Sequence, residues 1–264
     1  MLTEERKTAI MTCLRRERSV TVRALAKELY VSEATVRRDL RELEESGMLR
    51  RSHGGAVLEE NGAGEPSFLV RREENAAGKH RLAEAALPIL EGSVFFLDSS
   101  STVQALAAVW EAAHKTVITT GISTAFLFSR KQDARVILPG GNVRYLADSV
   151  GGATTLRQLE RFRADVCLCS CGGILPDGSL TESTAESGEI KATMLRRAER
   201  RILLADHSKW GRVRAYSFAT LREFDALVTD CRPPEETVRL CAACGVRLLY
   251  PSVPPFSRAG VDNP

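Results

Sequence analysis

Residues 31–57 read VSEATVRRDLRELEESGMLRRSHGGAV, and this stretch determines how the first part of the chain folds. Ser32 is a typical helix N-cap, and a negative charge follows it in the first turn, where the helix dipole favours one. Val36, Leu40 and Leu43 come next at spacings of four and three, the period of a helix buried on one face. The stretch therefore predicts an amphipathic helix that begins directly after Ser32.

Two further helices are predicted before this one, around residues 4–16 and after Thr21. Thr21 can cap the second of them, and the apolar residues of that helix form one stripe, namely Val22, Leu25, Ala26 and Leu29. Only a short break separates the second helix from the third. Two helices joined in this way are typical of a helix-turn-helix.

A short hairpin is predicted after the third helix. Residues 48–49 can pair with residues 56–58, with two glycines in the bend. A basic hairpin of this kind is a wing, which suits contact with the DNA backbone or minor groove, while the helix before it reads the major groove. Asp39 lies nearer the apolar side and is expected to form an ion pair instead. The alternative interpretation is that the charged outer face of the third helix is simply solvated and contacts no DNA. The residues predicted to contact DNA are Ser32, Thr35, Arg37, Arg38, Arg41, Arg50, Arg51, His53 and Gly54.

The positive charge of the chain is concentrated in the same region. The whole chain carries 37 basic and 34 acidic residues, a formal net charge of +3. Residues 1–57 hold twelve of the basic and nine of the acidic residues, so they account for the whole excess, and the rest of the chain is neutral. A small basic module joined to a larger neutral one indicates an anionic partner for the first.

Length and composition limit the class of protein. With 264 residues, 44% hydrophobic and 27% charged, the chain resembles an ordinary globular protein and not a disordered or fibrous one. No apolar run approaches the about 18–20 residues that a membrane helix needs, and the N-terminal MLTEERKTAI lacks the apolar core of a signal peptide. We therefore expect a cytoplasmic protein that does not associate with a membrane.

The cysteines are expected to be core residues. There are seven, an odd number, which disfavours a disulfide framework. Cys167, Cys169 and Cys171 alternate at the period of a strand, and Cys241 and Cys244 form a C-x-x-C in a predicted helix. A metal site is the alternative, but a structural zinc ion usually needs four ligands brought together. We predict core packing, no metal and no cofactor.

Residues 58–66, LEENGAGEP, are rich in glycine and charge and have no apolar period, so they predict a linker. It would join a DNA-binding domain, residues 1–57, to an effector-sensing domain, residues 67–264. In the second domain, strand-like runs such as SVFFLD, KTVITT, DVCLCS and RRILLAD alternate with helical stretches such as TVQALAAVWEAA. This alternation predicts an α/β domain with a parallel sheet, and ligands bind such sheets at the carboxyl ends of the strands.

Four loops that follow predicted strands form a candidate ligand site. The first, DSSST at 98–102, opens a helix, and its hydroxyl and backbone N–H groups predict an anion site with phosphate as the obvious ligand. A plain N-cap explains one hydroxyl but not four in a row. The other three loops are weaker individually, because glycines often serve only turns. The candidates in or near these loops are Asp98, Ser99, Ser100, Ser101, Thr102, Gly140, Gly141, Arg144, Gly172, Glu189, Lys191, Asp206 and Lys209.

Residues 31–57 resemble the winged helix-turn-helix of DeoR-family transcriptional regulators, in which a V-S-x-x-T-[IV]-R-R-D-L helix runs into an R-x-H-G-G-A wing. The second domain is similar to the DeoR sensor domain, and the resemblance extends over residues 2–249. It implies the fold of ribose-5-phosphate isomerase and glucosamine-6-phosphate deaminase. It also adds Lys79, from an N-x-x-x-K segment, and Thr120 to the effector-binding candidates. Ser100 stands where the family pattern has Gly, and Thr120 where it has Asn.

The predicted function is that of a sequence-specific DNA-binding regulator. We expect it to repress a sugar or carbohydrate operon and to bind double-stranded operator DNA under the control of a phosphorylated sugar or related metabolite. A homodimer or higher homo-oligomer is expected because symmetric operators mirror protein symmetry. One alternative is a sugar-phosphate isomerase or deaminase with an appended DNA-binding module. Its acid–base groups would come from Asp98, Glu186, Glu189, His207 and Lys209. Another is a non-specific architectural protein, whose DNA binding would respond to no metabolite.

Overall fold

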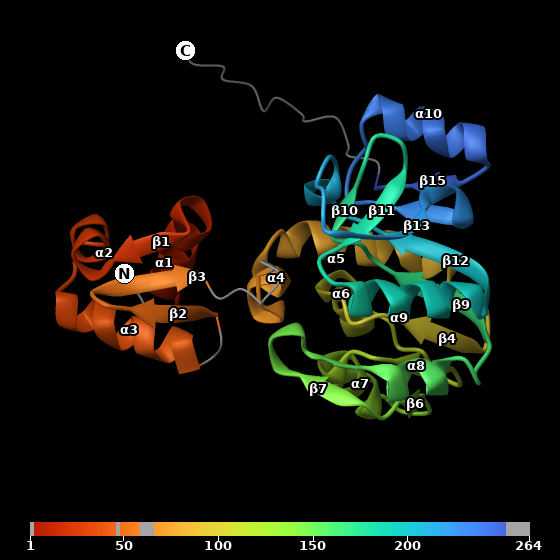
Figure 1. Ribbon diagram of the computed structural model, residues 1–264, viewed down its shortest axis with the longest axis horizontal. Helices are drawn as coiled ribbons and strands as arrows, with labels where there is room; N and C mark the ends of the chain where they lie inside the picture. The colour runs from red at the N-terminus through yellow and green to blue at the C-terminus, as the bar shows by residue number, and fades with distance from the viewer. Residues whose placement is uncertain (1–2, 46–47, 59–65, 252–264) are drawn as a thin grey trace, which may run out of the picture. The chain divides into compact units, whose positions relative to one another are not determined.

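The computed structural model describes residues 3–45, 48–58 and 66–251 (Figure 1). The chain divides into two compact units. The N-terminal unit comprises residues 1–74 with 144–147, and the α/β unit comprises residues 75–143 with 148–264. Most of the predicted linker, residues 59–65, lies outside the described residues. None of the described helices combines the length and the hydropathy that crossing a membrane requires.

The N-terminal unit contains the predicted helices and hairpin. Its helices are α1 (Thr3–Glu17), α2 (Val22–Glu28), α3 (Glu33–Glu45) and α4 (Phe68–Glu73), and its sheet, ordered β1-β3-β2, consists of β1 (Ser19–Thr21), β2 (Leu49–Ser52) and β3 (Gly55–Leu58). Strand β1, which pairs antiparallel with β3, was not predicted. The apolar faces meet in one core that includes Ile10, Leu14, Leu25, Val36 and Leu40, each at most 1% exposed.

A hydrogen bond fixes the start of helix α2, and two glycines shape the hairpin. The Thr21 hydroxyl accepts the backbone N–H of Ala24 at 3.1 Å, which confirms the predicted N-cap of α2. In the hairpin, Gly54 has a positive φ of +80°, a conformation that favours glycine. Gly55 is required for another reason, because a Cβ there would lie 2.0 Å from the Val20 carbonyl oxygen. The wing therefore packs against β1 only if residue 55 lacks a side chain.

The α/β unit is built on one seven-stranded parallel sheet, ordered β15-β14-β12-β9-β4-β5-β6. Its strands are β4 (Val94–Leu97), β5 (Thr116–Thr119), β6 (Arg135–Ile137), β9 (Ala164–Cys169), β12 (Ala198–Leu204), β14 (Ala226–Val228) and β15 (Arg247–Leu249). The chain runs outward from β4 through β5 to β6, then returns to β9 on the other side of β4. The direction of winding thus reverses between β4 and β9, the point at which doubly wound sheets bind ligands. The predicted fold class is confirmed.

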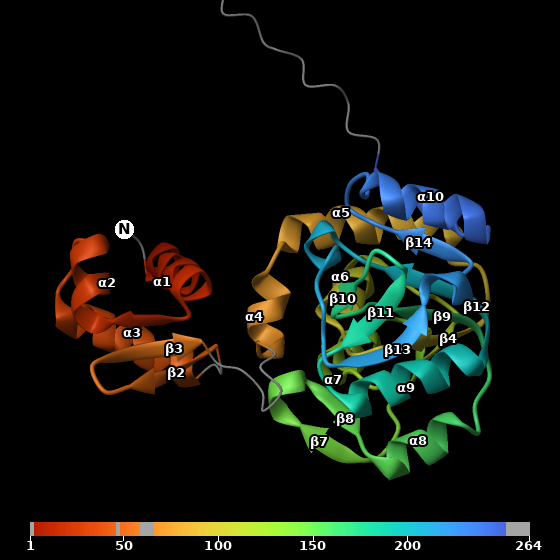
Figure 2. The same cartoon turned by 45° about the horizontal axis from the view of Figure 1, so that its top comes forward.

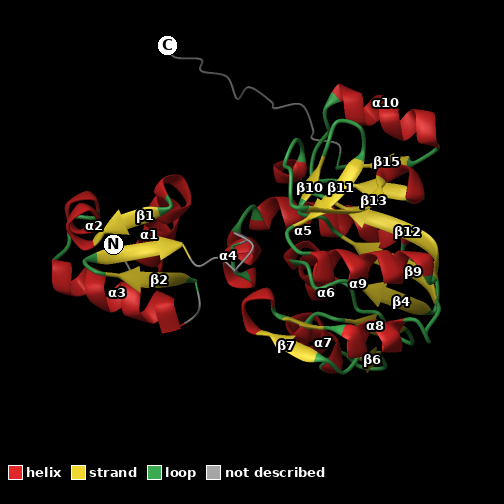
Figure 3. Ribbon diagram, in the orientation of Figure 1, coloured by secondary structure: helices red, strands yellow, loops and turns green. Residues whose placement is uncertain are grey.

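Helices cover both faces of this sheet (Figure 3). The helices of the unit are α5 (Ala76–Ala86), α6 (Ser101–Val109), α7 (Ile122–Ser129), α8 (Ala153–Leu159), α9 (Ala185–Arg196) and α10 (Glu235–Cys244), with 3-10 turns η1 (Leu87–Ile89), η2 (Tyr145–Ala147), η3 (His207–Lys209) and η4 (Leu221–Glu223), of which η2 belongs to the N-terminal unit. Phe95 and Leu97 pack with α5, α6 and α7, whereas Phe96, between them in β4, packs with α8 and α9. This alternation within one strand separates the two cores.

Two small antiparallel pairings were not predicted. Strands β10 (Gly173–Ile174), β11 (Ser179–Glu182) and β13 (Tyr216–Thr220) form a separate sheet, visible in Figure 2, and β7 (Asn142–Arg144) pairs with β8 (Ser149–Gly151). The small sheet lies against the core on the α9 side, to which Ile174 and Leu180 contribute.

All seven cysteines are free thiols. Cys167, Cys169 and Cys171 belong to one core cluster, as their alternation predicts, and Cys241 joins the same cluster. Burial raises the pKa of the Cys171 thiol to about 12 and that of Cys241 to about 11, so both are poor nucleophiles at neutral pH. The core-packing prediction is confirmed for these four, whereas Cys244 is half-buried.

Candidate functional site

Helix α3 presents a polar, exposed face that includes arginine side chains available to an anion. The Ser32 hydroxyl caps the helix by accepting the N–H of Thr35 at 3.1 Å, and the two hydroxyls lie 2.9 Å apart. Arg38 and Arg41 are exposed and form no hydrogen bond or ion pair with the described residues. Arg37 is also exposed but is held by Glu33 at 2.8 Å. Two arginines of this face are therefore available to an anion.

The opposite face of α3 is anchored by a buried ion pair. Asp39 is fully buried, and its Oδ1 accepts a hydrogen bond from the Arg6 guanidinium at 2.9 Å, while Arg6 Nε bonds Oδ2. The hydrogen bond to Asp39 raises the pKa of Arg6, against the effect of burial. The predicted ion-pairing role of Asp39 is thus confirmed, and it joins α1 to α3.

The wing projects its basic side chains into solvent. Arg50, Arg51 and His53 are exposed, and Gly54 forms the exposed bend. The Arg51 backbone N–H donates to the Glu44 carboxylate at 2.8 Å, so the base of the wing is tied to the last turn of α3. Helix and wing therefore offer cations from one continuous module, as a winged helix does when it binds DNA.

In the α/β unit, Asp98 joins the two central strands where the winding reverses. Its Oδ1 accepts the N–H of Ser100 at 2.8 Å, within its own loop after β4. Its Oδ2 accepts the N–H of Ser170 at 2.9 Å, in the loop after β9. The loops at 98–102 and 170–172, which contain six of the predicted residues, are therefore brought together at the carboxyl edge of the sheet.

Lys191 of α9 lies under these loops as a buried cation. Its Nζ is 3.0 Å from Asp98 Oδ2, donates to the Ser170 carbonyl at 2.6 Å and pairs with Glu182. Burial opposes its charge, but the carboxylates of Asp98 and Glu182 more than offset this and raise the pKa of Lys191. Lys191 is therefore charged and fully committed to protein partners.

The hydroxyl loop begins helix α6. Ser100 is the N-cap, since its hydroxyl accepts the N–H of Val103 at 3.1 Å, and its φ of −74° requires no glycine. Serine thus replaces the glycine of the family pattern without backbone strain. Ser101 and Thr102 are buried in the first turn of α6, and Ser99 is half-buried. The first turn of a helix with buried hydroxyls favours an anion.

A second group of charges follows β12. Asp206 is buried, and its Oδ1 accepts the N–H of Ser208 at 2.9 Å. Burial disfavours the charged form of Asp206, but Lys209, the hydrogen bonds to Ser208 and the charge of Lys79 lower its pKa below the ordinary value. Lys79 and Lys209 are themselves buried. The structure therefore brings two predicted lysines, Lys79 and Lys209, near the ionised carboxylate of a third predicted residue, Asp206.

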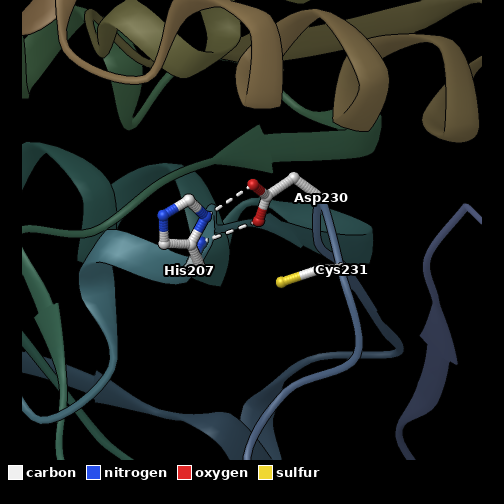
Figure 4. A group of neighbouring side chains, drawn as sticks. All are labelled: His207, Asp230 and Cys231. Carbon is white, nitrogen blue, oxygen red and sulfur yellow. Dashed lines mark hydrogen bonds and ion pairs between the residues drawn. The ribbon is translucent and has the colours of Figure 1, made fainter. Parts of the chain in front are cut away.

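His207, Asp230 and Cys231 form the one group of three potential metal ligands among the described residues (Figure 4). Asp230 Oδ1 accepts the backbone N–H of His207 at 2.8 Å, and Oδ2 lies 2.7 Å from His207 Nδ1 and accepts from Asn75 at 3.3 Å. Burial raises the pKa of Asp230, but the bonds to His207 outweigh it and lower the pKa. Since both carboxylate oxygens serve these bonds, the group acts as a clamp between the loops after β12 and β14.

The remaining predicted residues lie in different surroundings. Thr120 is buried after β5. Gly140 and Gly141 are exposed and follow β6. A Cβ on Gly141 would lie 2.0 Å from Thr155 Oγ1, so packing against Thr155 is enough to explain that glycine without a ligand. Arg144 is half-buried in a segment grouped with the N-terminal unit. Glu189 is exposed and accepts a hydrogen bond from the Tyr216 hydroxyl.

Six buried side-chain polar atoms of the α/β unit have no hydrogen-bond partner in the part of the chain that the structure describes. Three of them belong to Thr120, Asp206 and Thr229, which follow β5, β12 and β14 at the carboxyl edge of the sheet. The complete set is Thr120 Oγ1, Ser183 Oγ, Asp206 Oδ2, Trp210 Nε1, Arg214 Nε and Thr229 Oγ1. Buried polar groups are ordinarily paired, so the three atoms at the carboxyl edge mark places where a polar ligand would supply the partners.

Sequence reasoning missed Glu182 and Arg214. Glu182 ends the short strand β11 and pairs with Lys191, and nothing in its local sequence indicates burial. The backbone N–H of Arg214 donates to Thr181 Oγ1 at 3.1 Å, which places Arg214 beside Gly172. A Cβ added to Gly172 would lie 2.9 Å from Arg214 Cγ. Both positions depend on the unpredicted small sheet.

A winged helix with free arginines, attached to a doubly wound α/β unit, defines a DNA-binding transcriptional regulator. The model of the DeoR-like helix-turn-helix domain matches residues 6–61, and that of the DeoR C terminal sensor domain matches residues 74–231. The chain belongs to the DeoR family of transcriptional regulators.

Full-length relatives support this assignment. The transcriptional repressor GlcR of Bacillus subtilis is 34% identical over 250 residues, which cover 94% of this chain and 96% of the relative. The glycerol-3-phosphate regulon repressor of Escherichia coli is 30% identical over 238 residues, 89% of this chain and 94% of the relative. Among solved structures, ribose 5 phosphate isomerase A from Neisseria gonorrhoeae aligns over 50% of this chain and 52% of the isomerase chain. The identity is 14% and the TM-score 0.37, so the similarity is too distant for a functional argument.

Proposed function

We propose that this chain represses genes of carbohydrate metabolism and that a phosphorylated sugar or related metabolite, bound at the carboxyl edge of the α/β sheet, controls its affinity for operator DNA. The unpartnered buried polar atoms of Thr120, Asp206 and Thr229, which follow strands at that edge, carry the proposal. The names of relatives are consistent with it, since one is a glycerol-3-phosphate regulon repressor. In this proposal residues 1–57 bind DNA, residues 67–264 sense the effector, and residues 58–66 join them.

The charges of the site indicate how a phosphate would be held. The buried acidic groups at the edge are Asp98, Glu182, Asp206 and Asp230, and the buried basic groups are Lys79, Lys191 and Lys209. Lys191 already serves two carboxylates. Because the buried charges leave no excess of cations, the hydroxyls and N–H groups at the start of α6 are the natural phosphate ligands. The sugar would then face Asp206 and Thr120.

Control of DNA binding requires that the effector bind two states of the protein with different affinity. We expect a homodimer or higher homo-oligomer whose α3 helices and wings read the two halves of a symmetric operator. An effector that favours one arrangement of these modules would change the affinity of the pair for DNA.

The test uses the full chain and a labelled duplex that carries the site it selects from a random pool. Fluorescence anisotropy is measured with pentose and hexose phosphates and with the same sugars unphosphorylated. We expect a phosphorylated sugar to change the affinity and its unphosphorylated counterpart to leave it unchanged. Conversion of the sugar phosphate, followed by NMR, would favour an isomerase or deaminase instead. The absence of any response across the panel would refute the effector proposal.

Arg38→Ala should weaken binding to the selected duplex by about 10- to 100-fold, because an exposed arginine of the recognition helix would lose its contact with base or phosphate. Arg130→Ala, which removes one exposed arginine from the α/β unit, is the matched control and should have little effect. Thermal stabilisation of the Arg38→Ala variant by the effector should be unchanged. Loss of both properties would mean that the two modules are wrongly assigned.

Ser101→Ala combined with Thr102→Ala should raise the effector concentration needed for a response by at least about tenfold, because two hydroxyls that bond a charged phosphate would be lost. DNA affinity without effector should stay the same. Ser93→Ala, an exposed serine at the other end of β4, is the control. A normal effector response in the double variant would rule out the phosphate site at α6.

A further inference from the structure

The turn between α2 and α3 has an unusual residue at its centre. Helix α2 is capped at Leu29, and the next residue, Tyr30, has a φ of +54°. The N–H of Val31 donates to the Ala26 carbonyl at 3.1 Å, the bond that closes a Schellman motif. The residue after the C-cap of this motif is usually glycine, because a side chain strains a left-handed backbone. A bulky aromatic residue in this position is an outlier.

Packing does not explain the tyrosine. Its side chain is 95% exposed, the highest value among the exposed large hydrophobic residues of the described chain. It forms no hydrogen bond and no ring contact with the described residues. At this turn the protein therefore has two unfavourable features, a strained backbone and an aromatic ring exposed to solvent. Residues held in unfavourable conformations without internal compensation are concentrated at functional sites.

The position of the turn relates it to the DNA-binding face. Tyr30 stands two residues before Ser32, the N-cap of α3. In a helix-turn-helix the first helix crosses the DNA backbone, and the N-terminal residues of the second enter the major groove. Arg23 and Lys27, one turn apart on α2, are exposed and have no ion-pair partner among the described residues. The chain before α3 therefore offers two cations and a phenol where the phosphates that border the groove are expected.

We propose that the Tyr30 hydroxyl donates a hydrogen bond to a phosphate oxygen of the DNA backbone and so sets the position of α3 in the groove. Tyrosine is among the side chains that make such contacts, which position a protein on the duplex without reading its sequence. The proposal rests on DNA binding by α3, a property of the family, and is independent of the effector. It adds a contact from the turn to those expected from α3 and the wing.

Two substitutions separate the contact from the strain. Tyr30→Phe keeps the ring and the strained backbone and should weaken binding to the selected duplex about five- to tenfold, the usual net effect of losing one hydrogen bond. Tyr30→Gly should weaken binding at least as much. It should also slow hydrogen exchange of the α2 and α3 amides about fivefold, because glycine relieves the left-handed strain. A variant that binds DNA less well although its helices are better protected cannot be explained by misfolding.

The control is His114→Gly, an exposed ring with a φ of +58° in the α/β unit, which should leave DNA affinity unchanged. If Tyr30→Phe binds within twofold of the natural chain in an assay in which Arg38→Ala binds weakly, the proposed contact of Tyr30 is overturned. DNA binding by α3 would still stand. The contact would also be overturned if sedimentation of Tyr30→Phe without DNA showed a changed association between copies that accounts for the whole loss. Failure of the natural chain to select any duplex would instead overturn DNA binding itself.

Discussion

Lys191→Met is expected to destabilise the α/β unit by about 3–5 kcal/mol, the usual cost of removing one partner of a buried ion pair. Asp98 and Glu182 would be left buried beside each other without their shared cation, and the Ser170 carbonyl would lose its donor. Both tryptophans of the chain, Trp110 and Trp210, lie in the α/β unit. Urea unfolding of the full chain followed by tryptophan fluorescence therefore reports on this unit.

Two companion variants test the cause of this loss. Lys191→Met combined with Glu182→Gln should recover part of the stability, because Asp98, the carboxylate of the pair that remains, keeps the N–H groups of Ser100 and Ser170. Lys115→Met removes a half-buried lysine that forms no ion pair with the described residues, and it should cost less than about 1 kcal/mol. If Lys191→Met were no more harmful than Lys115→Met, Lys191 would not be the buried partner of the two carboxylates.

Asp39→Ala is expected to destabilise the N-terminal unit by about 2–3 kcal/mol, because the Arg6 guanidinium would lose two charge-assisted hydrogen bonds. The expected cost is below that for Lys191, since only one charged group, Arg6, loses the bonds to Asp39, whereas Lys191 serves two buried carboxylates. Hydrogen exchange of the α1 and α3 amides in the full chain measures the change. Protection should fall about 30- to 150-fold.

The same two helices supply the control. Lys7 and Glu42 also join α1 to α3, at 2.9 Å, but both side chains are partly exposed. Glu42→Gln should therefore cost less than about 1 kcal/mol. Arg6→Met combined with Asp39→Leu should restore much of the stability, since well-packed apolar residues often replace a buried ion pair without loss. Equal effects of Asp39→Ala and Glu42→Gln would contradict the structural role of the buried pair.

The N-terminal unit was largely predictable because its structure depends on contacts that are local in sequence. The stripe of Val36, Leu40 and Leu43, the caps at Thr21 and Ser32 and the glycines of the wing all leave short-range patterns. Strand β1 left none, since three residues pair with β3 across some 35 positions and the residues themselves, Ser19–Thr21, show no strand period. The strained turn at Tyr30 was equally hidden, because a tyrosine does not suggest a positive φ.

The α/β unit was predictable in its sheet but not in its smaller pieces. Continuous apolar runs, such as 94–97 and 202–204, indicate strands buried on both faces, and parallel pairing then brings their carboxyl ends to one edge. This explains why loop residues such as Asp98 and Asp206 were found. Glu182 was not, because β11 pairs with β13 across helix α9 and strand β12, and no local pattern encodes so distant a pairing.

The two hydrogen bonds that Asp98 accepts from the N–H groups of Ser100 and Ser170 also bear on the entropy of ligand binding. These hydrogen bonds order the start of α6 and the loop after β9 before any ligand arrives, so little conformational freedom remains to be lost there. A rigid receptor of this kind contributes affinity but little movement. A change that reaches DNA would then have to originate outside these two loops.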